Sequence, residues 1–415
     1  MRWNLMGRAV KASVLSLAMA LGVSACSNDY TVSYVYLATS NPLPHGLINS
    51  YQVDYQSGFL HVMPDSPVDA GGRNTVAIVA SPNQKFIYTV NNFDSSVVEF
   101  AIGTDGKLYA QHTYNITGSF PTAAAIDPAG KFLYVTFTYQ NTANGQPLYT
   151  PANPGPGGVT VFPINSDPSK PPPQEPGSLG TPFTVNAGRN PVAVAVSSTG
   201  NYVYVIDQDA ATQANLLGFT PSTNPVPLKP MPNVTINAGN VPSTGFPSGL
   251  NPSGIIGDAS GTHLYVTDKV ANQVGVYSID ANGVPALVTT VPTDAGPMGM
   301  SFDLNGKYLY VAASAANAVD IYSVGSNGLL TRLASGGTVQ VGNGPTCVSV
   351  SGAPSDANPH HAVYLYTSNS LSNSVSGEQL NESDGTLVQM LGSPFGGSSL
   401  PACLVTVPAF PLRNR

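Results

Sequence analysis

The chain has 415 residues, of which only 9% are Asp, Glu, Lys or Arg, and its formal net charge is −7. The 42 glycines and 37 prolines indicate a β-rich, turn-rich protein, and length alone favours two or three domains. The sequence has no cluster of basic residues that would neutralise phosphates, which excludes nucleic acid as a partner.

The N-terminus has the pattern of a secretion signal. Arg2, Arg8 and Lys11 form a basic region before an apolar stretch, Ala12–Val23, that is too short to span a membrane. We therefore predict a signal peptide over residues 1–25.

The signal ends in Val23-Ser24-Ala25-Cys26, which resembles the lipobox of bacterial lipoproteins. The resemblance implies that a peptidase cuts before Cys26, that this cysteine carries lipid, and that residues 26–31 form a linker. Ser27, in place of Asp, resembles the signal for sorting to the outer membrane. The expected location is the cell envelope, with the lipid on Cys26 in the membrane and the rest of the chain facing the periplasm or the surface. The alternative is an ordinary signal peptide followed by a chance cysteine.

From residue 32 onward one motif recurs seven times. Each copy contains a Leu-Tyr-Val-Thr-like stretch, usually preceded by an alternating small and apolar stretch that begins at a proline. In five copies this first stretch begins 13 residues before the tyrosine, as from Pro121 to Tyr134. The seven tyrosines are Tyr36, Tyr88, Tyr134, Tyr204, Tyr265, Tyr310 and Tyr366. Such self-similarity indicates a repeat architecture.

Each repeat predicts four strands joined by tight turns. Turns of the Asp-x-x-Gly type, at Asp127, Asp258 and Asp303, connect the first strand to the second, and we expect these aspartates to cap their own backbone rather than bind a metal. The third strand carries an apolar residue three positions before an aromatic one, as at Val97 and Phe100. Asn-Gly or Asp-Gly turns lead to the fourth strand. Four strands per repeat indicate the blades of a β-propeller.

The two ends of the repeat region are complementary. The first repeat lacks a first strand, while Pro401–Val407 has the pattern of one and stands alone at the C-terminus. If this last strand joins the first blade, the ring closes and no sheet edge stays open there. We predict an all-β fold, a seven-bladed β-propeller of four-stranded antiparallel blades over residues 32–409, with a tail over residues 410–415. One ring thus replaces the domains that length suggests.

The repeats resemble those of the seven-bladed propellers of the lactonase type and of the related Tyr-Val-Thr-Asn repeat proteins. The best matching segments are Asn305–Val311 and Gly130–Val135, and the resemblance covers about residues 32–409. It implies the propeller fold, a site at the mouth of the central channel, and 6-phosphogluconolactonase-like hydrolysis as a candidate activity.

Two cysteines occupy equivalent positions, two residues after the start of the first strand. Cys347 belongs to the last blade and Cys403 to the closing strand, which are neighbours in the predicted ring. Export would place both in an oxidising compartment. We predict a Cys347–Cys403 disulfide, worth about 4 kcal/mol on the chain-entropy model. The alternative is two buried free thiols.

Two loops on the expected channel-mouth face begin alike, with Gly72-Arg73-Asn74 and Gly188-Arg189-Asn190. A pair of guanidinium groups, from Arg73 and Arg189, would suit a carboxylate or a phosphate. The alternative is two solvated loop arginines.

The same face carries polar candidates for ligand binding where the second strands end. They are Asn91, Asn92, Asp94, Asp207, Asp209, Asp268 and Lys269. The acidic members would pair with the arginines, bind Ca²⁺, or simply form polar loop surface, which is the interpretation we favour. We expect no metal and no cofactor. Two long connections on this face, Tyr139–Gly157 and Asn237–Asn251, would form a rim.

Lactone hydrolysis calls for histidine and arginine at the mouth, for acid–base work and for stabilising an oxyanion. Lactonases share a loop of the Gly-Pro-Arg-His type. At the matching positions this chain has Gly296-Pro297-Met298-Gly299 and Gly344-Pro345-Thr346-Cys347, so it departs from the lactonase pattern there. Of the histidines only His45 falls in a loop that reaches the mouth. The catalytic candidates are therefore His45, Arg73 and Arg189.

The sequence favours a monomeric, envelope-anchored propeller that binds a protein, a glycan or a small anion through its channel-mouth face. One alternative is a lactonase-type hydrolase acting on a lactone or sugar acid, and another is a structural surface lipoprotein. The only tryptophan, Trp3, lies in the signal peptide. Its absence from the mature chain excludes Trp-Asp repeat propellers and propellers with Trp-docked blades.

Overall fold

The computed structural model describes residues 31–41, 44–140, 156–208, 214–222, 228–237, 243–351, 362–397 and 399–409. The chain from Thr31 onward forms one compact unit. The predicted signal peptide, Cys26 and the C-terminal tail lie outside the described residues.

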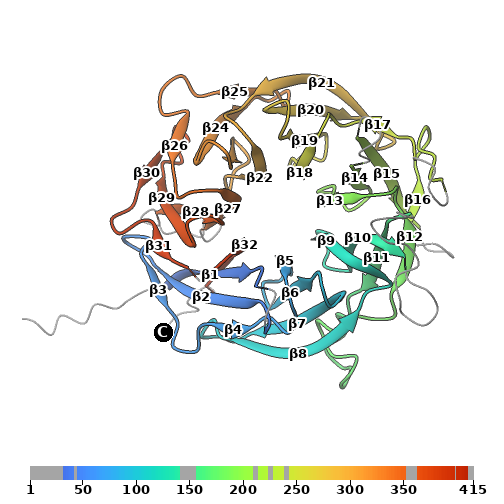
Figure 1. Cartoon of the computed structure of the whole chain (residues 1–415), viewed down its shortest axis with the longest axis horizontal. Helices are drawn as coiled ribbons and strands as arrows, with labels where there is room; N and C mark the ends of the chain where they lie inside the picture. The colour runs from blue at the N-terminus through green and yellow to red at the C-terminus, as the bar shows by residue number, and fades with distance from the viewer. Residues whose placement is uncertain are drawn as a thin grey trace, which may run out of the picture. The chain divides into compact units, whose positions relative to one another are not determined.

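The described strands form seven antiparallel sheets, the blades, which are arranged in a ring (Figure 1). Blade 1 contains β32 (Pro401–Pro408), β1 (Thr31–Thr39), β2 (Leu47–Asp54), β3 (Leu60–Val62) and β4 (Val68–Asp69). Blade 2 contains β5 (Thr75–Ala80), β6 (Phe86–Asn91), β7 (Ser96–Ile102) and β8 (Leu108–Asn115). Blade 3 contains β9 (Gly118–Ile126), β10 (Phe132–Gln140), β11 (Gly158–Pro163) and β12 (Phe183–Asn186).

The other four blades follow in chain order. Blade 4 contains β13 (Pro191–Val196), β14 (Val203–Asp207), β15 (Asn215–Pro221), β16 (Leu228–Pro230) and β17 (Phe246–Pro247). Blade 5 contains β18 (Pro252–Gly257), β19 (His263–Asp268), β20 (Gln273–Ile279) and β21 (Pro285–Pro292). Blade 6 contains β22 (Pro297–Phe302), β23 (Tyr308–Ala313), β24 (Ala318–Val324), β25 (Leu330–Arg332) and β26 (Thr338–Gln340). Blade 7 contains β27 (Pro345–Ser351), β28 (Val363–Asn369), β29 (Ser374–Leu380), β30 (Leu387–Gln389) and β31 (Phe395–Gly396).

The C-terminal strand closes the ring, which confirms the prediction. β32 pairs antiparallel with β1, so that Val405 lies opposite Tyr36 and Cys403 opposite Ala38. In four blades the fourth strand is split into two short segments that pair with the same third strand, as β3 and β4 do with β2. Each blade therefore keeps the order of four strands that the repeat predicts.

Apolar side chains fill the gaps between neighbouring blades. The gap between blades 1 and 2, for example, contains Tyr36, Ile48, Ile78 and Phe100, all less than 5% exposed. Comparable clusters lie between the other blades. Burial between blades is the main contribution to the stability of the ring.

The tyrosines of the second strands also join the blades through their hydroxyl groups. Each described bond runs to a glycine carbonyl in the turn between the third and fourth strands of the next blade. The pairs are Tyr36–Gly106 (2.6 Å), Tyr88–Gly177 (2.7 Å), Tyr204–Gly283 (2.7 Å), Tyr265–Gly328 (2.8 Å), Tyr310–Gly385 (3.0 Å) and Tyr366–Gly58 (2.6 Å). The sequence predicted that these tyrosines pack between sheets, and the structure adds a hydrogen bond across the gap.

The acceptor glycines are also covered by the aromatic or imidazole side chain of a second residue of the neighbouring blade. The residue two positions before each tyrosine packs on the turn, as Tyr34 does on Gly106. A Cβ atom on Gly106 would lie 2.1 Å from Tyr34 Cε1, and the φ of this glycine is +80°. In blade 5 the covering residue is His263, whose Nδ1 lies 3.1 Å from Asp258 Oδ2. This histidine is thus part of the joint between blades.

The Asp-x-x-Gly turns bind their own backbone, as predicted. Asp127 Oδ1 accepts hydrogen bonds from the amides of Lys131 and Phe132, both at 2.6 Å. Asp303 Oδ1 accepts one from the amide of Tyr308 at 2.7 Å. These carboxylates stabilise the connection between the first and second strands.

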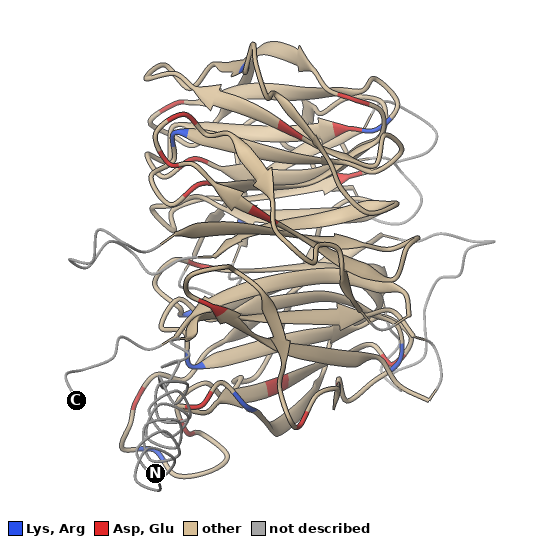
Figure 2. Cartoon of the chain, turned by 90° about the vertical axis from the view of Figure 1, so that its left-hand side faces the viewer, with Lys and Arg blue, Asp and Glu red and all other residues tan. Residues whose placement is uncertain are grey.

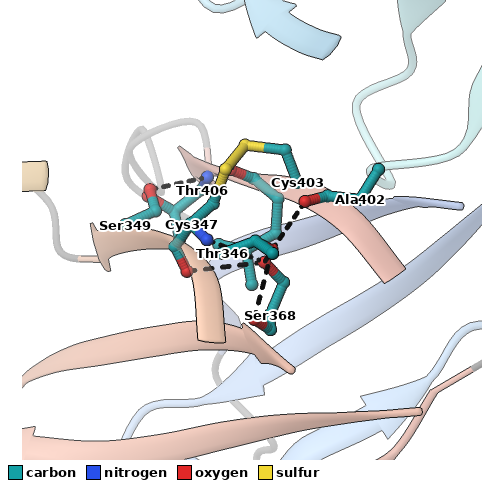
Figure 3. Close-up of a disulfide and its surroundings, with 8 residues drawn as sticks. Thr346, Cys347, Ser349, Ser368, Ala402, Cys403 and Thr406 are labelled. Carbon is teal, nitrogen blue, oxygen red and sulfur yellow. Dashed lines mark hydrogen bonds between the residues drawn. A yellow bond between two sulfur atoms is a disulfide. The ribbon is translucent and has the colours of Figure 1, made fainter. Parts of the chain in front are cut away.

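The closing strand is also tied to the preceding inner strand. Cys347 of β27 and Cys403 of β32 are joined with an S–S distance of 2.06 Å (Figure 3). Beside the bridge, Thr346 Oγ1 donates to the carbonyl of Ala402 at 2.7 Å. Blades 7 and 1 therefore meet through their innermost strands. That the disulfide forms in the exported protein stays a prediction.

Candidate functional site

The channel-mouth face is built by the connections between blades and by the loops between second and third strands. In six blades the residue after the second strand donates its amide to the carbonyl that precedes the inner strand. These bonds are Ser40–Leu400, Asn92–Asn74, Gln208–Asn190, Lys269–Asn251, Ser314–Gly296 and Ser370–Gly344, at 2.8–3.0 Å. In blade 3 the side chain of Thr138 bonds the carbonyl of Phe120 at 3.3 Å. We call these seven residues (Ser40, Asn92, Thr138, Gln208, Lys269, Ser314 and Ser370) the entrance ring.

Each inner strand is irregular at this face. The pairing between first and second strands shifts after the first residue of the inner strand in six blades and after Pro121, within β9, in blade 3. Such a shift is the pattern of a β-bulge. In three blades the residue at the bulge donates a hydrogen bond from its side-chain hydroxyl to a backbone carbonyl of the next inner strand. Thr122 donates to Pro191, Ser253 to Pro297 and Thr346 to Ala402, each at 2.7 Å. The bulges thus tie the channel entrance together.

Three predicted ligand-binding residues, Asn91, Asp207 and Asp268, are buried at the ends of second strands. Asp268 accepts hydrogen bonds from the amides of Leu250 (2.7 Å) and Asn251 (3.1 Å). Asp207 accepts them from the amides of Arg189 (2.9 Å) and Asn190 (2.7 Å). Asn91 accepts one from the hydroxyl of Thr75 at 2.8 Å. All three hold the incoming loop, and we leave them out of the proposed site.

The two arginines belong to different corners of the ring. Arg73 precedes β5 and Arg189 precedes β13, and β9 lies between these inner strands (Figure 1). Each backbone amide donates to an aspartate of its own blade, Asp94 for Arg73 (2.6 Å) and Asp207 for Arg189 (2.9 Å). The two arginines are therefore better treated as separate candidates.

The guanidinium of Arg73 is fixed by Asp94. Nε and Nη2 lie 2.8 Å and 2.5 Å from Asp94 Oδ1, while Oδ2 accepts the backbone amide. These hydrogen bonds from Arg73 hold the pKa of Asp94 below its usual value. Both side chains keep solvent contact, with 42% of Arg73 and 29% of Asp94 exposed.

His45 lies beside this pair, at the edge of blade 1. Its Nδ1 is 2.8 Å from Asp69 Oδ2 and 3.0 Å from Oδ1. The next residue, Gly46, donates its amide to the carbonyl of Gly72 at 2.7 Å, which brings the two loops together. We call His45, Asp69, Arg73 and Asp94 the blade 1–2 corner.

Lys269, the remaining predicted residue, is the charged member of the entrance ring. It is exposed, yet partial burial of its ammonium lowers its pKa. In the described part of the chain no carboxylate forms an ion pair with it. Asp209 and most of the loop from Tyr139 to Gly157 lie outside the described residues, as does part of Asn237–Asn251.

Sequence reasoning missed a set of exposed apolar side chains on the channel-mouth face. They are Phe93, Phe120, Leu250, Val270, Leu371 and Leu400, between 36% and 76% exposed. Phe120 and Leu400 have positive φ values, +57° and +56°, which bulky residues rarely adopt. Three other blades have Asn74, Gly296 and Gly344 in this place. The replacement of Gly or Asn by Phe and Leu is a signal that the sequence already contained.

Charged residues are scattered over the propeller, mostly where strands end (Figure 2). Within the described ranges, no group of three or more His, Cys, Asp or Glu is arranged to hold a metal ion. Nor does any helix in the described chain have the length and apolar character of a membrane span.

Comparison with known proteins gives one family match. The model of the family described as lactonase, 7-bladed β-propeller, matches residues 47–144 and 228–350. No curated protein matches the chain.

Solved structures share the fold at low identity. A provisionally assigned 6-phosphogluconolactonase from Bacteroides fragilis is 21% identical, with a TM-score of 0.66, over 92% of this chain and 99% of that one. The periplasmic gluconolactonase PpgL from Pseudomonas aeruginosa is 18% identical, with a TM-score of 0.68, over 91% and 99%. A protein of unknown function from Desulfotomaculum acetoxidans is 13% identical, with a TM-score of 0.61, over 90% and 99%. At these identities the likeness is one of fold.

Proposed function

Because the chain belongs to the lactonase family of seven-bladed β-propellers, we propose that the blade 1–2 corner hydrolyses a lactone. One observation carries the proposal: a histidine oriented by a carboxylate and an arginine fixed by a second carboxylate lie on loops that are joined by a hydrogen bond. The sequence named His45 and Arg73 as catalytic candidates separately, and their loops meet in this corner.

The corner has groups for each step of lactone opening. With its proton on Nδ1, facing Asp69, His45 has a lone pair on Nε2 that accepts a proton from water. The resulting hydroxide attacks the lactone carbonyl, and Arg73 stabilises the negative oxygen of the tetrahedral intermediate. The bond between the carbonyl carbon and the ring oxygen then breaks, and His45 returns its proton to the ring oxygen. The product is a hydroxy acid.

The charge of the corner favours an uncharged substrate. Asp69 and Asp94 contribute two negative charges and Arg73 one positive charge, so a phosphate group would meet net repulsion. Asp94 already occupies two guanidinium nitrogens of Arg73. We therefore propose an unphosphorylated sugar lactone as the substrate class.

Replacing His45 by Gln is expected to lower the rate of enzymatic lactone hydrolysis at least 100-fold, because the general base is lost. The measurement is the release of acid from glucono-δ-lactone at constant pH, corrected for spontaneous hydrolysis. Arg73→Gln should lower kcat to a similar extent, since it removes the oxyanion donor.

His61→Gln is the matched control, because His61 lies exposed on the outer strand β3 and has no part in the proposal. Its activity should equal that of the wild type. A wild-type rate no faster than spontaneous hydrolysis, or full activity in His45→Gln, would refute lactone hydrolysis at this corner.

A second candidate function is a binding module that uses the channel-mouth face. Its support is the set of exposed apolar side chains around the entrance, two of them at positive φ. A photo-crosslinking amino acid at Phe93, tested in whole cells, should give a defined product that is absent with the same label at Val62 on β3. Equal labelling from both positions would remove this candidate.

We also propose that the propeller is an envelope lipoprotein anchored through Cys26. The support is the lipobox-like segment Val23–Cys26 after a basic and apolar N-terminus. Cells grown with an alkyne-labelled fatty acid should label the wild-type chain and should not label Cys26→Ser. Labelling of both chains, or of neither, would contradict the anchor.

A further inference from the structure

One position of the third strand differs in blade 5. In each blade the residue after the second-strand tyrosine lies opposite a residue of the third strand. In blade 5 this pair is Val266 and Gly275. In the other six blades the third-strand residue has a side chain, and the six residues are Asn49, Val98, Thr160, Leu217, Asp320 and Ser376. Blade 5 therefore lacks a side chain where every other blade has one.

Blade 2 shows what the side chain at this position does. Val98 packs against the connection that leads to β5, because a Cβ atom on Gly71 would lie 2.8 Å from Val98 Cγ2. Counted back from the inner strand, Ser248 of blade 5 occupies the position of Gly71, four residues before the strand begins. Blade 5 thus combines serine in the connection with Gly275 in the third strand, where blade 2 combines glycine with valine.

A cavity of about 130 Å³ lies at this place in blade 5. Its walls come from the connection after β17 and from β19, β20 and β21, and they include Ser248, Val266, Gly275, Tyr277 and Leu287. β17 of blade 4 lies beside β21 of blade 5 (Figure 1). Leu287 is 51% exposed, so the cavity opens toward solvent beside the outer strand. None of the described wall residues belongs to an inner strand, which separates this cavity from the central channel.

Ser248 supplies a hydrogen-bonding group to the cavity. The residue is 3% exposed, and its Oγ has no hydrogen-bond partner among the described residues. The hydroxyl of Tyr277, by contrast, donates to the carbonyl of Pro247 at 2.9 Å. A buried hydroxyl without a partner costs free energy, so a ligand that forms a hydrogen bond with Ser248 would remove this cost.

The walls favour an uncharged ligand. Asp268 is the one charged residue among the described wall residues, and it is 2% exposed. Its carboxylate already accepts hydrogen bonds from four amides, those of Leu250 (2.7 Å), Asn251 (3.1 Å), Val270 (3.1 Å) and Ala271 (3.2 Å). An anion would meet this carboxylate without a cation to balance it, and a cation would compete with four amide donors.

We propose that this cavity binds a small uncharged molecule with an apolar body and one hydroxyl group, which forms a hydrogen bond with Ser248. An apolar cavity of about 150 Å³ accommodates benzene, so the volume here suits a single six-membered ring. Val266, Tyr277 and Leu287 would contact the ring. Phenol is the simplest probe of this class. The site lies away from the blade 1–2 corner and does not depend on the proposed hydrolysis.

The first test compares phenol with toluene, which has a methyl group in place of the hydroxyl. In isothermal titration calorimetry with the full-length protein, phenol should bind one to one and about fivefold more tightly than toluene, as expected for one hydrogen bond. Ser248→Ala should remove this difference by weakening phenol binding alone. It should also raise the melting temperature of the free protein, because it removes a buried hydroxyl without a partner.

The second test fills the cavity. Gly275→Val introduces the residue that blade 2 has at this place, and it should abolish the binding of phenol and of toluene. A Cβ atom on Gly275 would lie 3.0 Å from Tyr277 Cε2 and 3.5 Å from Leu287 Cδ1, so these side chains must shift slightly. Gly275→Ala adds the Cβ atom alone and should weaken phenol binding if the valine variant does not fold.

The matched control is Gly396→Val, because Gly396 is exposed on β31 and a Cβ atom there would have nothing within 4 Å. It should bind phenol as the wild type does, and so should His45→Gln, which separates this site from the catalytic proposal. Three results would overturn the inference: no phenol binding by the wild type, phenol binding no tighter than that of toluene, or unchanged phenol affinity in the folded Gly275 variants. Tighter binding of benzylamine than of phenol would also overturn it, because it would show a cation site at Asp268.

Discussion

Raising the pH from 5 to 9 is expected to lower the free energy of unfolding by about 4 kcal/mol through a single carboxyl group, Glu378. Its side chain lies on β29 and is fully buried. Neither carboxyl oxygen has a hydrogen-bond partner among the described residues. Burial without a partner raises the pKa of Glu378 to about 8.

The sign follows from proton linkage. In the unfolded chain Glu378 has its ordinary pKa of 4.5, and in the folded protein about 8. The stabilisation is complete below pH 4.5, where both states are protonated, and it is lost as the pH rises through 8. Glu99, also fully buried, has a pKa raised to about 7 by burial, and it acts in the same direction. The carboxylates with lowered pKa values, such as Asp94, change stability only at lower pH.

Denaturant unfolding at pH 5, 7 and 9 measures this effect. The variant Glu378→Gln keeps the shape of the side chain and removes its titratable carboxyl group. Its stability should therefore depend less on pH than that of the wild type. The third strands of the other blades have an aromatic residue at this place, as at Phe100 and Tyr322. Glu378→Phe should therefore be more stable than the wild type at pH 9. Equal wild-type stability at pH 5 and 9 would contradict the assignment.

Replacing Gly106 by Ala is expected to destabilise the protein by about 2–4 kcal/mol. The new Cβ would lie 2.1 Å from the ring of Tyr34, and the φ of +80° is unfavourable for any side chain. The turn would have to move, which would also break the 2.6 Å bond from the hydroxyl of Tyr36 to the carbonyl of Gly106.

Gly306→Ala separates the clash from the backbone effect. Gly306 also has a positive φ, +67°, but a Cβ atom added to it would have nothing within 4 Å. Its replacement should cost only about 1 kcal/mol, from the left-handed conformation alone. Thermal unfolding of both variants gives the comparison. If the two substitutions cost the same, the joint between blades does not depend on close packing at Gly106.

The fold was predictable because its determinants repeat. Seven tyrosines in equivalent strands define the blades, five of them 13 residues after the start of an inner strand. The unpaired pattern of Pro401–Val407 indicated how the ring closes. The hydrogen bonds from these tyrosines to glycine carbonyls were not predictable, because each joins a strand of one blade to a turn of the next. Tyr36 and Gly106, for example, are 70 residues apart in the sequence.

The candidate site was predictable only in part. The sequence named His45, Arg73 and Asp94, but their partners depend on how two loops meet at a blade corner. Asp69, which orients His45, comes from the outer strand β4 and has no local signal. Asp207 and Asp268 were named as ligand candidates because polar residues end the second strands. In the structure the same positions cap incoming loops, which polarity alone does not distinguish from binding.

The closed ring, in which β32 pairs with β1 and lies beside β27, sets the register of the seven blades. The most direct measurement is peptide mapping of unreduced, alkylated protein purified from the membrane fraction, where the proposed anchor on Cys26 would place it. The segment between Cys347 and Cys403 contains no Lys or Arg, so a protease that cuts after Glu378 and Glu382 is needed to separate the two cysteines. The closed ring predicts one disulfide-linked pair of peptides containing Cys347 and Cys403. Alkylation of both cysteines without reduction would contradict it.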